Sequence, residues 1–506
     1  MQPVGVTPHS VGPALADLTG KLSSGRPGPA IRTRLTVPQY LSGKTVLLTG
    51  ATGFLGKVVI ERLLRCAPDI ARIYLLIRPR REPQVPSSPV QVRFDGEVLA
   101  SPVFDELAAQ RGDEWTNFAR DRLVPVAGDV SQPQLGLADA DLDRLHSCVD
   151  IVINAAASVV FDEPIDQALL HNVRSVEHVA TFARRCRSAS LVHVSTAFVA
   201  GRRTGRFLEE PLTPNLASSQ IDALDDLVTG HLRQARDEGW DDRHLRARLV
   251  ADGMARAREL GWHDVYTFTK ALGEMVLAER RGDVPTAILR PSIIESSLRD
   301  PSPGWLENLN VGDPLWVEFG RGRMPDFPLS PSAVLDMVPV DFVANSLIAL
   351  LPRVGETPAI AYYTVGSGAL NPLTGTTIHD VSYEYFLRNP MYDRRGQPIR
   401  PRRLTFPTYD QFRETFGGEA GRGATTRRLL YLAELYETYM NTPCVFDTTN
   451  TQRLLDDLSP SDRAVLDFDV RRIDWRSYIQ QVHIPGLRRH VLGEDPDGRP
   501  ARRADA

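Results

Sequence analysis

Short apolar runs alternate with helical patterns from residue 44 onward, and this alternation constrains the fold more than any other feature. A continuous apolar run suits a strand that is buried on both faces of a parallel sheet. Such runs cover residues 44–49, 72–77, 123–127, 150–155, 191–194 and 286–289, and the clearest helical patterns between them cover 57–66 and 165–187. The sequence therefore predicts an α/β fold, a doubly wound parallel sheet with helices on both faces.

Three regions follow from the length of 506 residues and from changes in composition. Residues 1–40 are expected to be a flexible N-terminal tail, because they carry Pro, Gly and Ser without the apolar core of a signal peptide. Residues 41–365 are expected to form the doubly wound domain, with insertions at 79–121 and 202–262. Residues 366–506 are expected to form a C-terminal domain that is mostly helical.

Charge and cysteine content exclude several classes of protein. Lys and Arg number 59 against 63 Asp and Glu, so the formal net charge is −4, which argues against a dedicated nucleic-acid binder. The four cysteines lie far apart and form no CxxC pair, which indicates a reducing compartment and no cysteine zinc cluster; no metal site is expected. No window reaches the roughly 18 apolar residues of a membrane span. We expect a cytoplasmic protein without a transmembrane span, and peripheral membrane contact stays open.

A glycine-rich loop joins the first expected strand to the first expected helix. Gly50, Gly53 and Gly56 are spaced as GxxGxxG, and glycines allow the backbone to approach a pyrophosphate at a helix N-terminus. The loop predicts a Rossmann site for a dinucleotide, and its spacing resembles that of the short-chain dehydrogenase/reductase superfamily. The contacts expected from this loop come from Gly50, Thr52, Gly53, Phe54, Leu55 and Gly56.

The end of the second expected strand indicates which dinucleotide binds. An acidic residue there would bind the ribose 2′-hydroxyl of NAD, but the chain has Arg78, which suits the 2′-phosphate of NADPH. We therefore predict NADPH as the cofactor, and a solvated basic turn is the alternative reading of Arg78. By resemblance to the superfamily, further cofactor contacts are expected from Asp129, Val130, Ala155, Ala156, Pro291 and Ile293.

Tyr266 and Lys270 are the expected centre of catalysis. Residues at i and i+4 share one face of a helix, and a nearby ammonium favours the phenolate and so lowers the pKa of a phenol. Lys270 is also expected to hold the nicotinamide ribose. Thr196, five residues before Gly201, matches the superfamily hydroxyl that donates to the substrate carbonyl, with Ser195 as the competing assignment. Asn172 resembles the superfamily asparagine that supports the lysine through water.

The stretch from 44 to 350 resembles the fatty acyl-CoA reductases, a family of extended short-chain dehydrogenases/reductases, and the carboxyl part also fits this family. The matching motifs are spread over most of the chain, and they lie at 49–57, 101–105, 128–130, 135–137, 161–163, 266–274, 303–305, 338–341, 366–368, 371–374, 446–447, 473–475 and 485–487. His263-Asp264-Val265 and Asn154 depart from the usual family pattern. These departures concern the shape of the substrate site more than the chemistry.

This resemblance implies that a long-chain fatty acyl-CoA thioester is reduced to a primary fatty alcohol through a fatty aldehyde, with release of CoA. Two NADPH are consumed, and no cysteine nucleophile takes part. The expected acyl and CoA region comprises residues 202–262, 300–335 and 366–440. Three alternatives remain: an aldehyde-releasing acyl-CoA or acyl carrier protein reductase, a nucleotide-sugar epimerase or dehydratase, and a nucleotide-sensing regulator. The sequence does not indicate an oligomeric state.

Overall fold

The computed structural model describes residues 35–79, 89–212, 218–324, 326–417, 423–441 and 444–494. From Thr36 onward the chain forms one compact unit. The predicted tail lies outside the described residues as far as Arg34. Its last residues belong to helix α1 (Val37–Leu41), in which Thr36 forms a capping box and Val37 and Leu41 are buried.

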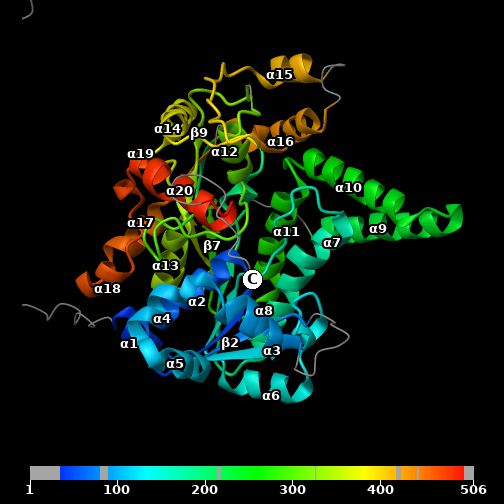
Figure 1. The fold of residues 1–506 in the computed structure, drawn as a ribbon. Coiled ribbons are helices and arrows are strands. Elements are labelled where there is room, and N and C mark those ends of the chain that lie inside the picture. Colours follow the sequence, from blue (N-terminus) through cyan, green and yellow to red (C-terminus); the bar gives the residue numbers. More distant parts are fainter. Residues whose placement is uncertain are drawn as a thin grey trace, which may run out of the picture. The chain divides into compact units, whose positions relative to one another are not determined.

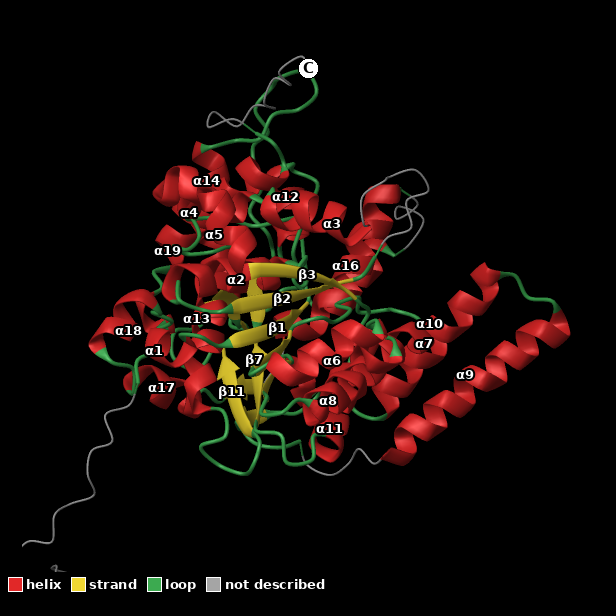
Figure 2. Ribbon diagram, turned by 90° about the horizontal axis from the view of Figure 1, so that it is seen from below, coloured by secondary structure: helices red, strands yellow, loops and turns green. Residues whose placement is uncertain are grey.

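A seven-stranded parallel sheet occupies the centre of this unit (Figures 1 and 2). The order of the strands is β11-β7-β5-β4-β1-β2-β3, so the direction of winding reverses between β1 and β4. The strands are β1 (Thr45–Thr49), β2 (Arg72–Ile77), β3 (Leu123–Ala127), β4 (Ile151–Asn154), β5 (Ser190–Val194), β7 (Thr286–Pro291) and β11 (Ala361–Val365). The doubly wound α/β fold is thus confirmed. The sequence analysis missed β11, a half-buried edge strand with two tyrosines.

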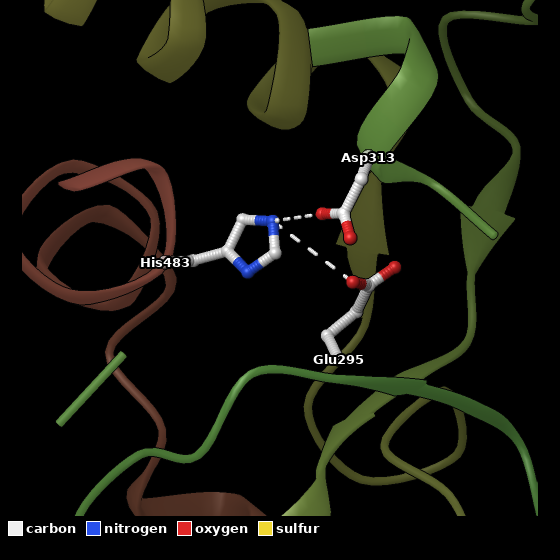
Figure 3. Close-up of side chains that lie close together, drawn as sticks. All are labelled: Glu295, Asp313 and His483. Atoms are coloured by element: carbon white, nitrogen blue, oxygen red, sulfur yellow. Dashed lines mark ion pairs between the residues drawn. The ribbon is translucent and has the colours of Figure 1, made fainter. Parts of the chain in front are cut away.

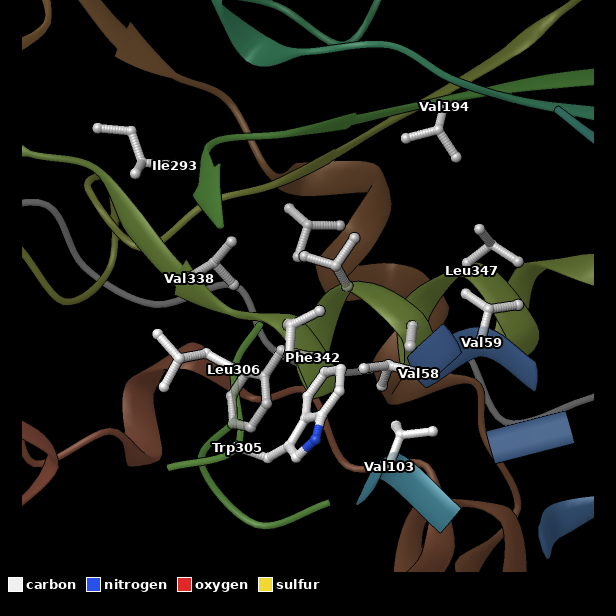
Figure 4. Packing of buried hydrophobic residues seen from close by; sticks show 14 of the residues in the cluster. Val58, Val59, Val103, Val194, Ile293, Trp305, Leu306, Val338, Phe342 and Leu347 are labelled. Carbon is white, nitrogen blue, oxygen red and sulfur yellow. The ribbon is translucent and has the colours of Figure 1, made fainter. Parts of the chain in front are cut away.

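One face of the sheet is covered by α2 (Phe54–Cys66) and α13 (Val340–Leu350). Val58 and Val59 of α2 lie against Phe342 and Leu347 of α13, and Val194 of β5 belongs to the same hydrophobic cluster (Figure 4). Every residue of α13 is buried. The apolar stretch at 338–351 is therefore mainly a core helix. No helix in the described part of the chain is long and apolar enough to cross a membrane.

The opposite face is covered by α6 (Asp139–Cys148), α8 (Ser175–Arg185) and α11 (Val265–Arg280). Leu145, Val179 and Leu277 from these helices share a second hydrophobic cluster with Leu47 and Val152 of the sheet. A π-helical stretch (Leu170–Arg174) joins α7 (Ile165–Leu169) to α8, so the long helix predicted at 165–187 is one nearly continuous helical run.

Both insertions are largely helical. The first contains α3 (Pro89–Arg93), a π-helical stretch (Phe94–Leu99), α4 (Asp105–Arg111) and α5 (Trp115–Arg122). The second contains α9 (Ser218–Glu238) and α10 (Asp242–Glu259), which form a helical hairpin that extends away from the sheet (Figures 1 and 2).

The chain after β11 is mostly helical and contacts the sheet domain through two strand pairs. β12 (Leu373–Thr374) is antiparallel to β9 (Val334–Leu335), and β13 (Cys444–Phe446) is parallel to β6 (Gly205–Phe207). A third small pair joins β8 (Ile293–Glu295) to β10 (Met337–Pro339). The helices not yet named are α12 (Asp313–Gly320), α14 (Gly375–Arg388), α15 (Tyr409–Phe416), α16 (Ala424–Asn441), α17 (Thr449–Asp456), α18 (Pro460–Val465), α19 (Trp475–Ser477) and α20 (Ile484–Gly486). We propose the domain boundary at residue 365, where the last strand of the sheet ends.

Candidate active site

Two adjoining cavities lie at the carboxyl ends of the central strands, where the winding reverses. This is the place at which doubly wound folds bind their ligands. The first cavity, of about 400 Å³, is formed by the loops that follow β1, β2, β3 and β4. The second, of about 520 Å³, contains Thr196, Tyr266 and Lys270 in its wall. The cavities share Gly50, Gly53, Ala155 and Ala157, so one cleft runs from the glycine loop to the tyrosine.

The glycine loop leaves no room for side chains at two of its positions. Gly50 has a φ of +74°, and a Cβ there would lie 2.7 Å from the carbonyl of Ala155. A Cβ at Gly56 would lie 2.1 Å from the carbonyl oxygen of Gly50. Gly53 precedes the first residue of α2 and opens the helix N-terminus toward the cleft. The loop therefore fits the close approach of a pyrophosphate.

Arg78 and Arg93 lie at the far end of the first cavity. The Arg78 side chain is 64% exposed, and its guanidinium is 4.0 Å from the carboxylate of Asp129. Arg93 donates to the carbonyl of Arg78 at 2.6 Å and forms an ion pair with Glu97. The sequence analysis missed Arg93, because a single arginine in an inserted helix carries no motif. Arg80 and Arg81, which follow Arg78 and Pro79 in the sequence, lie outside the described residues.

A buried hydrogen-bond chain fixes the wall beside the glycine loop. Asn154 Oδ1 accepts from the Thr49 hydroxyl at 2.7 Å, and its Nδ2 lies 3.0 Å from Nδ1 of His193. Thr49 in turn accepts from the N–H of Ala156 at 3.1 Å. The chain thereby holds Ala155 and Ala156 against the cleft, where the sequence predicted cofactor contacts. Asp129 and Val130 line the same cavity.

Helix α11 carries Tyr266 and Lys270 into the second cavity. Asp264 caps this helix by accepting from the N–H of Thr267 at 2.7 Å, and Tyr439 of α16 donates to the same carboxylate at 2.6 Å. The departure from the family pattern at residues 263–265 thus supplies a helix cap. A residue of the C-terminal region anchors that cap.

Thr196 is the hydroxyl that contacts Tyr266. Burial raises the pKa of the Tyr266 phenol, and a hydrogen bond from Thr196 offsets only part of this rise, so Tyr266 stays protonated at neutral pH. Thr196 Oγ1 also lies 3.4 Å from the Pro291 carbonyl. The Ser195 hydroxyl is buried and has no hydrogen-bond partner among the described residues, although it lines the same cavity. Thr196 as the catalytic hydroxyl stays a prediction, which its interaction with Tyr266 supports.

Lys270 donates to the carbonyl of Val194 at 2.7 Å. Burial lowers the pKa of Lys270 to about 8, and the charge of Glu274 opposes this shift. The lowering of the Tyr266 pKa that the sequence analysis expected from Lys270 is not seen, because the ammonium donates to this carbonyl and burial dominates the phenol.

Asn172 lies behind the cleft. Its Nδ2 donates to the Ser158 carbonyl and to the Thr269 hydroxyl, both at 3.1 Å, and its Oδ1 accepts from the N–H of Ser158. It makes no direct hydrogen bond to Lys270 among the described residues. Its contacts position the loop after β4, and support of the lysine through water stays a prediction.

The C-terminal region contributes residues that the sequence analysis did not identify individually. Tyr436 and Tyr439 of α16 line the second cavity, together with the predicted Pro291 and Ile293 and with Asn310 and Pro314 at the start of α12. Phe161 links the two helices: its ring contacts Tyr266 of α11 edge-on and also contacts Tyr436 and Tyr439 of α16. No local spacing relates α16 to α11, so these residues could be placed only by the fold.

This fold, with a glycine loop after β1 and a hydroxyl, a tyrosine and a lysine at the switch point, defines an oxidoreductase of the extended short-chain dehydrogenase/reductase class. Solved structures share the fold. The terminal R domain of a myxalamid PKS-NRPS pathway superposes with a TM-score of 0.59 at 23% identity, covering 89% of this chain and 92% of its own. The reductase domain of a non-ribosomal peptide synthetase from Mycobacterium tuberculosis has a TM-score of 0.55 at 21% identity, with coverages of 89% and 92%.

Sequence comparison defines the family. Two models, both described as male sterility protein, match residues 48–347 and 407–494. Fatty acyl-CoA reductase 1 of Arabidopsis thaliana is 36% identical, over 90% of this chain and 98% of its own length. Alcohol-forming fatty acyl-CoA reductase of Simmondsia chinensis is 30% identical, over 90% and 99%. The chain belongs to the fatty acyl-CoA reductase family and uses a nicotinamide cofactor.

Proposed function

We propose that the protein reduces long-chain fatty acyl-CoA to a primary fatty alcohol with NADPH and releases CoA. The observation that carries this proposal is the junction of the two cavities, where the dinucleotide cleft opens directly onto Thr196, Tyr266 and Lys270. A reactive carbonyl bound in the second cavity would lie between these groups and the cofactor. The choice of acyl-CoA as the substrate rests on the names of the relatives given above.

Charge supports NADPH over NADH. The cavity contains Arg78 and Arg93 at the end where the adenosine ribose is expected, and the residue that directly follows β2 is Arg78 rather than an acidic residue. Arg93 is already paired with Glu97, whereas Arg78 is mostly exposed and lies only at the limit of an ion pair with Asp129. Arg78 is therefore the better candidate for the 2′-phosphate.

Tyr266 and Thr196 act as hydrogen-bond donors in the proposed reaction, and Lys270 positions the reacting groups. Bound NADPH supplies the hydride that the thioester carbonyl carbon accepts. Tyr266 is protonated at neutral pH and Thr196 lies beside it, so both hydroxyls can donate to the oxygen as negative charge develops there. Collapse of the tetrahedral species then expels the CoA thiol and leaves an aldehyde. In the second reduction, Tyr266 donates the proton that completes the alcohol.

An apolar cavity of about 80 Å³ has lining residues close in the sequence to those of the reaction cavity, and we infer that it takes part of an acyl chain. Its wall is formed by α12, α14 and α16 with the neighbouring loops, and includes Trp316, Phe319, Met337 and Met440. Neighbouring residues of the same helices line the two cavities. Pro314 and Tyr436 line the reaction cavity, and Leu315 and Met440 line the apolar cavity. Cavities with a mainly apolar lining can accept hydrocarbon. These segments fall within the predicted acyl region at 300–335 and 366–440.

The positions of the cysteines argue against a covalent acyl-cysteine intermediate. All four lie in the described part of the chain, and none lines either half of the cleft. Burial raises the pKa of the Cys66 and Cys444 thiols to about 11 and that of Cys186 to about 12, which suppresses the nucleophilic thiolate. Direct hydride transfer to the thioester is therefore the route that fits.

NADPH oxidation measured across acyl-CoA chain lengths, with chromatography of the products, tests the proposal. We expect oxidation that depends on long-chain acyl-CoA and a fatty alcohol as the final product. Accumulation of aldehyde would instead support the aldehyde-releasing alternative, and activity on nucleotide sugars alone would support the epimerase alternative. The cytoplasmic location stays a prediction; the Arabidopsis thaliana relative fatty acyl-CoA reductase 2 is named chloroplastic.

A further inference from the structure

Three ionisable side chains meet in the interior, outside the residues that line the reaction cavity. Glu295 ends β8, Asp313 begins α12, and His483 ends a π-helical stretch (Tyr478–His483) near the C-terminus (Figure 3). Their side chains are at most 1% exposed. Nε2 of His483 lies 3.2 Å from Oδ1 of Asp313 and 3.9 Å from Oε2 of Glu295. Neither the proposed reaction nor the predicted site residues use this cluster.

The atoms that face one another make no hydrogen bonds of normal geometry within the described structure. This holds for Nε2 of His483, Oδ1 of Asp313 and both carboxylate oxygens of Glu295. The Asp313 oxygen is close to the imidazole but does not lie where an N–H on Nε2 would point. Buried charged groups are costly unless they are paired and hydrogen-bonded, or coordinate a metal. These four buried atoms therefore lack the partners that their burial would require.

The outer atoms of two of these side chains, His483 and Asp313, are hydrogen-bonded. Nδ1 of His483 lies 3.0 Å from the Ser296 hydroxyl, and Oδ2 of Asp313 accepts from the N–H of Asn310 at 2.6 Å. In metal sites, bonds of this kind fix the orientation of the ring and of the carboxylate while the inner atoms bind the ion. The inner atoms of these two side chains are Nε2 of His483 and Oδ1 of Asp313, and both lack hydrogen-bond partners, as do the two carboxylate oxygens of Glu295.

We propose that Glu295, Asp313 and His483 form a binding site for one divalent transition-metal ion, with Zn²⁺ as the best match. One imidazole nitrogen and two carboxylates are ligands that Zn²⁺ accepts. Two ligands at bond lengths of about 2.0–2.2 Å on a tetrahedral ion lie about 3.3–3.6 Å apart, and the distances of 3.2 and 3.9 Å lie on either side of that range. Two carboxylates and a neutral imidazole would balance the charge of the ion.

The ion would have a structural role beside the reaction cavity. It would join β8, α12 and the C-terminal segment through Glu295, Asp313 and His483. Asn310, whose backbone holds Asp313, and Pro314, which follows it, both line the reaction cavity. The wall formed by the start of α12 would thus be fixed by the metal. The sequence analysis expected no metal site, because ligands so far apart in the chain form no motif.

Metal content of the full chain tests this site. The protein is expressed with added Zn²⁺, freed of loosely bound ions by desalting, and analysed by inductively coupled plasma mass spectrometry. We expect one Zn²⁺ per chain, a fall to background in Asp313→Asn and Glu295→Gln, and no fall in His379→Gln, which changes another buried histidine. Growth with Co²⁺ should give the visible absorption of a tetrahedral cobalt site in the wild type alone.

The competing arrangement is a proton on Glu295 and a charged His483 paired with Asp313. It predicts wild-type protein without metal and a Glu295→Gln variant at least as stable as the wild type. That result overturns the proposal, and so does a metal content that Asp313→Asn and Glu295→Gln leave unchanged. If these variants fail to fold, the wild type decides: removal of bound metal by a strong chelator should lower its Tm, and an unchanged Tm with no metal released contradicts the site.

Discussion

The two ends of the cleft are built from different parts of the chain. At the glycine loop the backbone forms the site, since Gly50 and Gly56 have no space for a Cβ and the N-terminus of α2 faces the cavity. At the reaction end, side chains from three segments meet, since Thr196 follows β5, Tyr266 lies on α11 and Tyr439 comes from α16. The first end should therefore be sensitive to added atoms, and the second to the removal of functional groups.

The largest effect should follow removal of one hydroxyl at the reaction end. Tyr266→Phe keeps the ring that contacts Phe161 but removes the proton donor, so kcat should fall by about 10²–10⁴. NADPH binding, followed by fluorescence, should stay close to that of the wild type. Tyr431→Phe, which changes an exposed tyrosine bonded to Asp162, is the matched control and should keep its activity. A Tyr266→Phe enzyme with near-normal kcat would remove this residue from the reaction.

Addition of one methyl group should damage the glycine-loop end. In Gly56→Ala the new Cβ would meet the Gly50 carbonyl oxygen at 2.1 Å, so the loop must open. Overpacking of this kind costs about 1–3 kcal/mol, and we expect NADPH to bind roughly 5- to 150-fold more weakly if the strain is relieved by loss of the bound conformation. Titration with NADPH measures this change.

The control for this experiment is a glycine with open space. Gly230→Ala lies within α9, where an added Cβ would have no atom within 4 Å. It should leave NADPH affinity unchanged and should stabilise the helix by about 1 kcal/mol. Equal affinity of Gly56→Ala and wild type would show that the loop does not need the close backbone approach.

Charge reversal at the adenosine end should change the choice of cofactor more than the rate. A hydrogen bond to a charged group is worth about 1.5–3 kcal/mol, so Arg78→Asp should reduce the kcat/KM ratio of NADPH to NADH by about 10- to 150-fold. Arg93→Met should change this ratio less, because Glu97 already pairs with Arg93. If the ratio stays constant in Arg78→Asp, another group binds the 2′-phosphate.

The smallest effect should be a shift along the pH axis. The pKa of Lys270 is lowered to about 8, so its ammonium loses a proton as the pH rises through 8, and kcat/KM should fall over the same range. The Glu274 carboxylate opposes this lowering, so Glu274→Gln should move the fall to lower pH. Glu274 also forms a buried ion pair with Arg290 at 2.7 Å, so folding of the variant must be checked by circular dichroism. A pH profile that does not move assigns the fall to another group.

The same contrast explains what the sequence could predict. Six of the seven strands, the glycine loop and the pair Tyr266 and Lys270 depend on neighbouring residues, so periodicity and spacing identified them. The edge strand β11 escaped because its Tyr-Tyr-Thr run is half-buried rather than apolar throughout. Tyr439, Arg93 and the cluster of Glu295, Asp313 and His483 depend on contacts between distant segments, which no local pattern encodes.

The ratio of NADPH oxidised to CoA thiol released tests the central proposal most directly. Reduction of one thioester to one alcohol consumes two NADPH and two protons and releases one CoA. With a long-chain acyl-CoA as the limiting substrate, we therefore predict two NADPH per thiol and a fatty alcohol as the product. One NADPH per thiol with accumulation of fatty aldehyde would contradict the account.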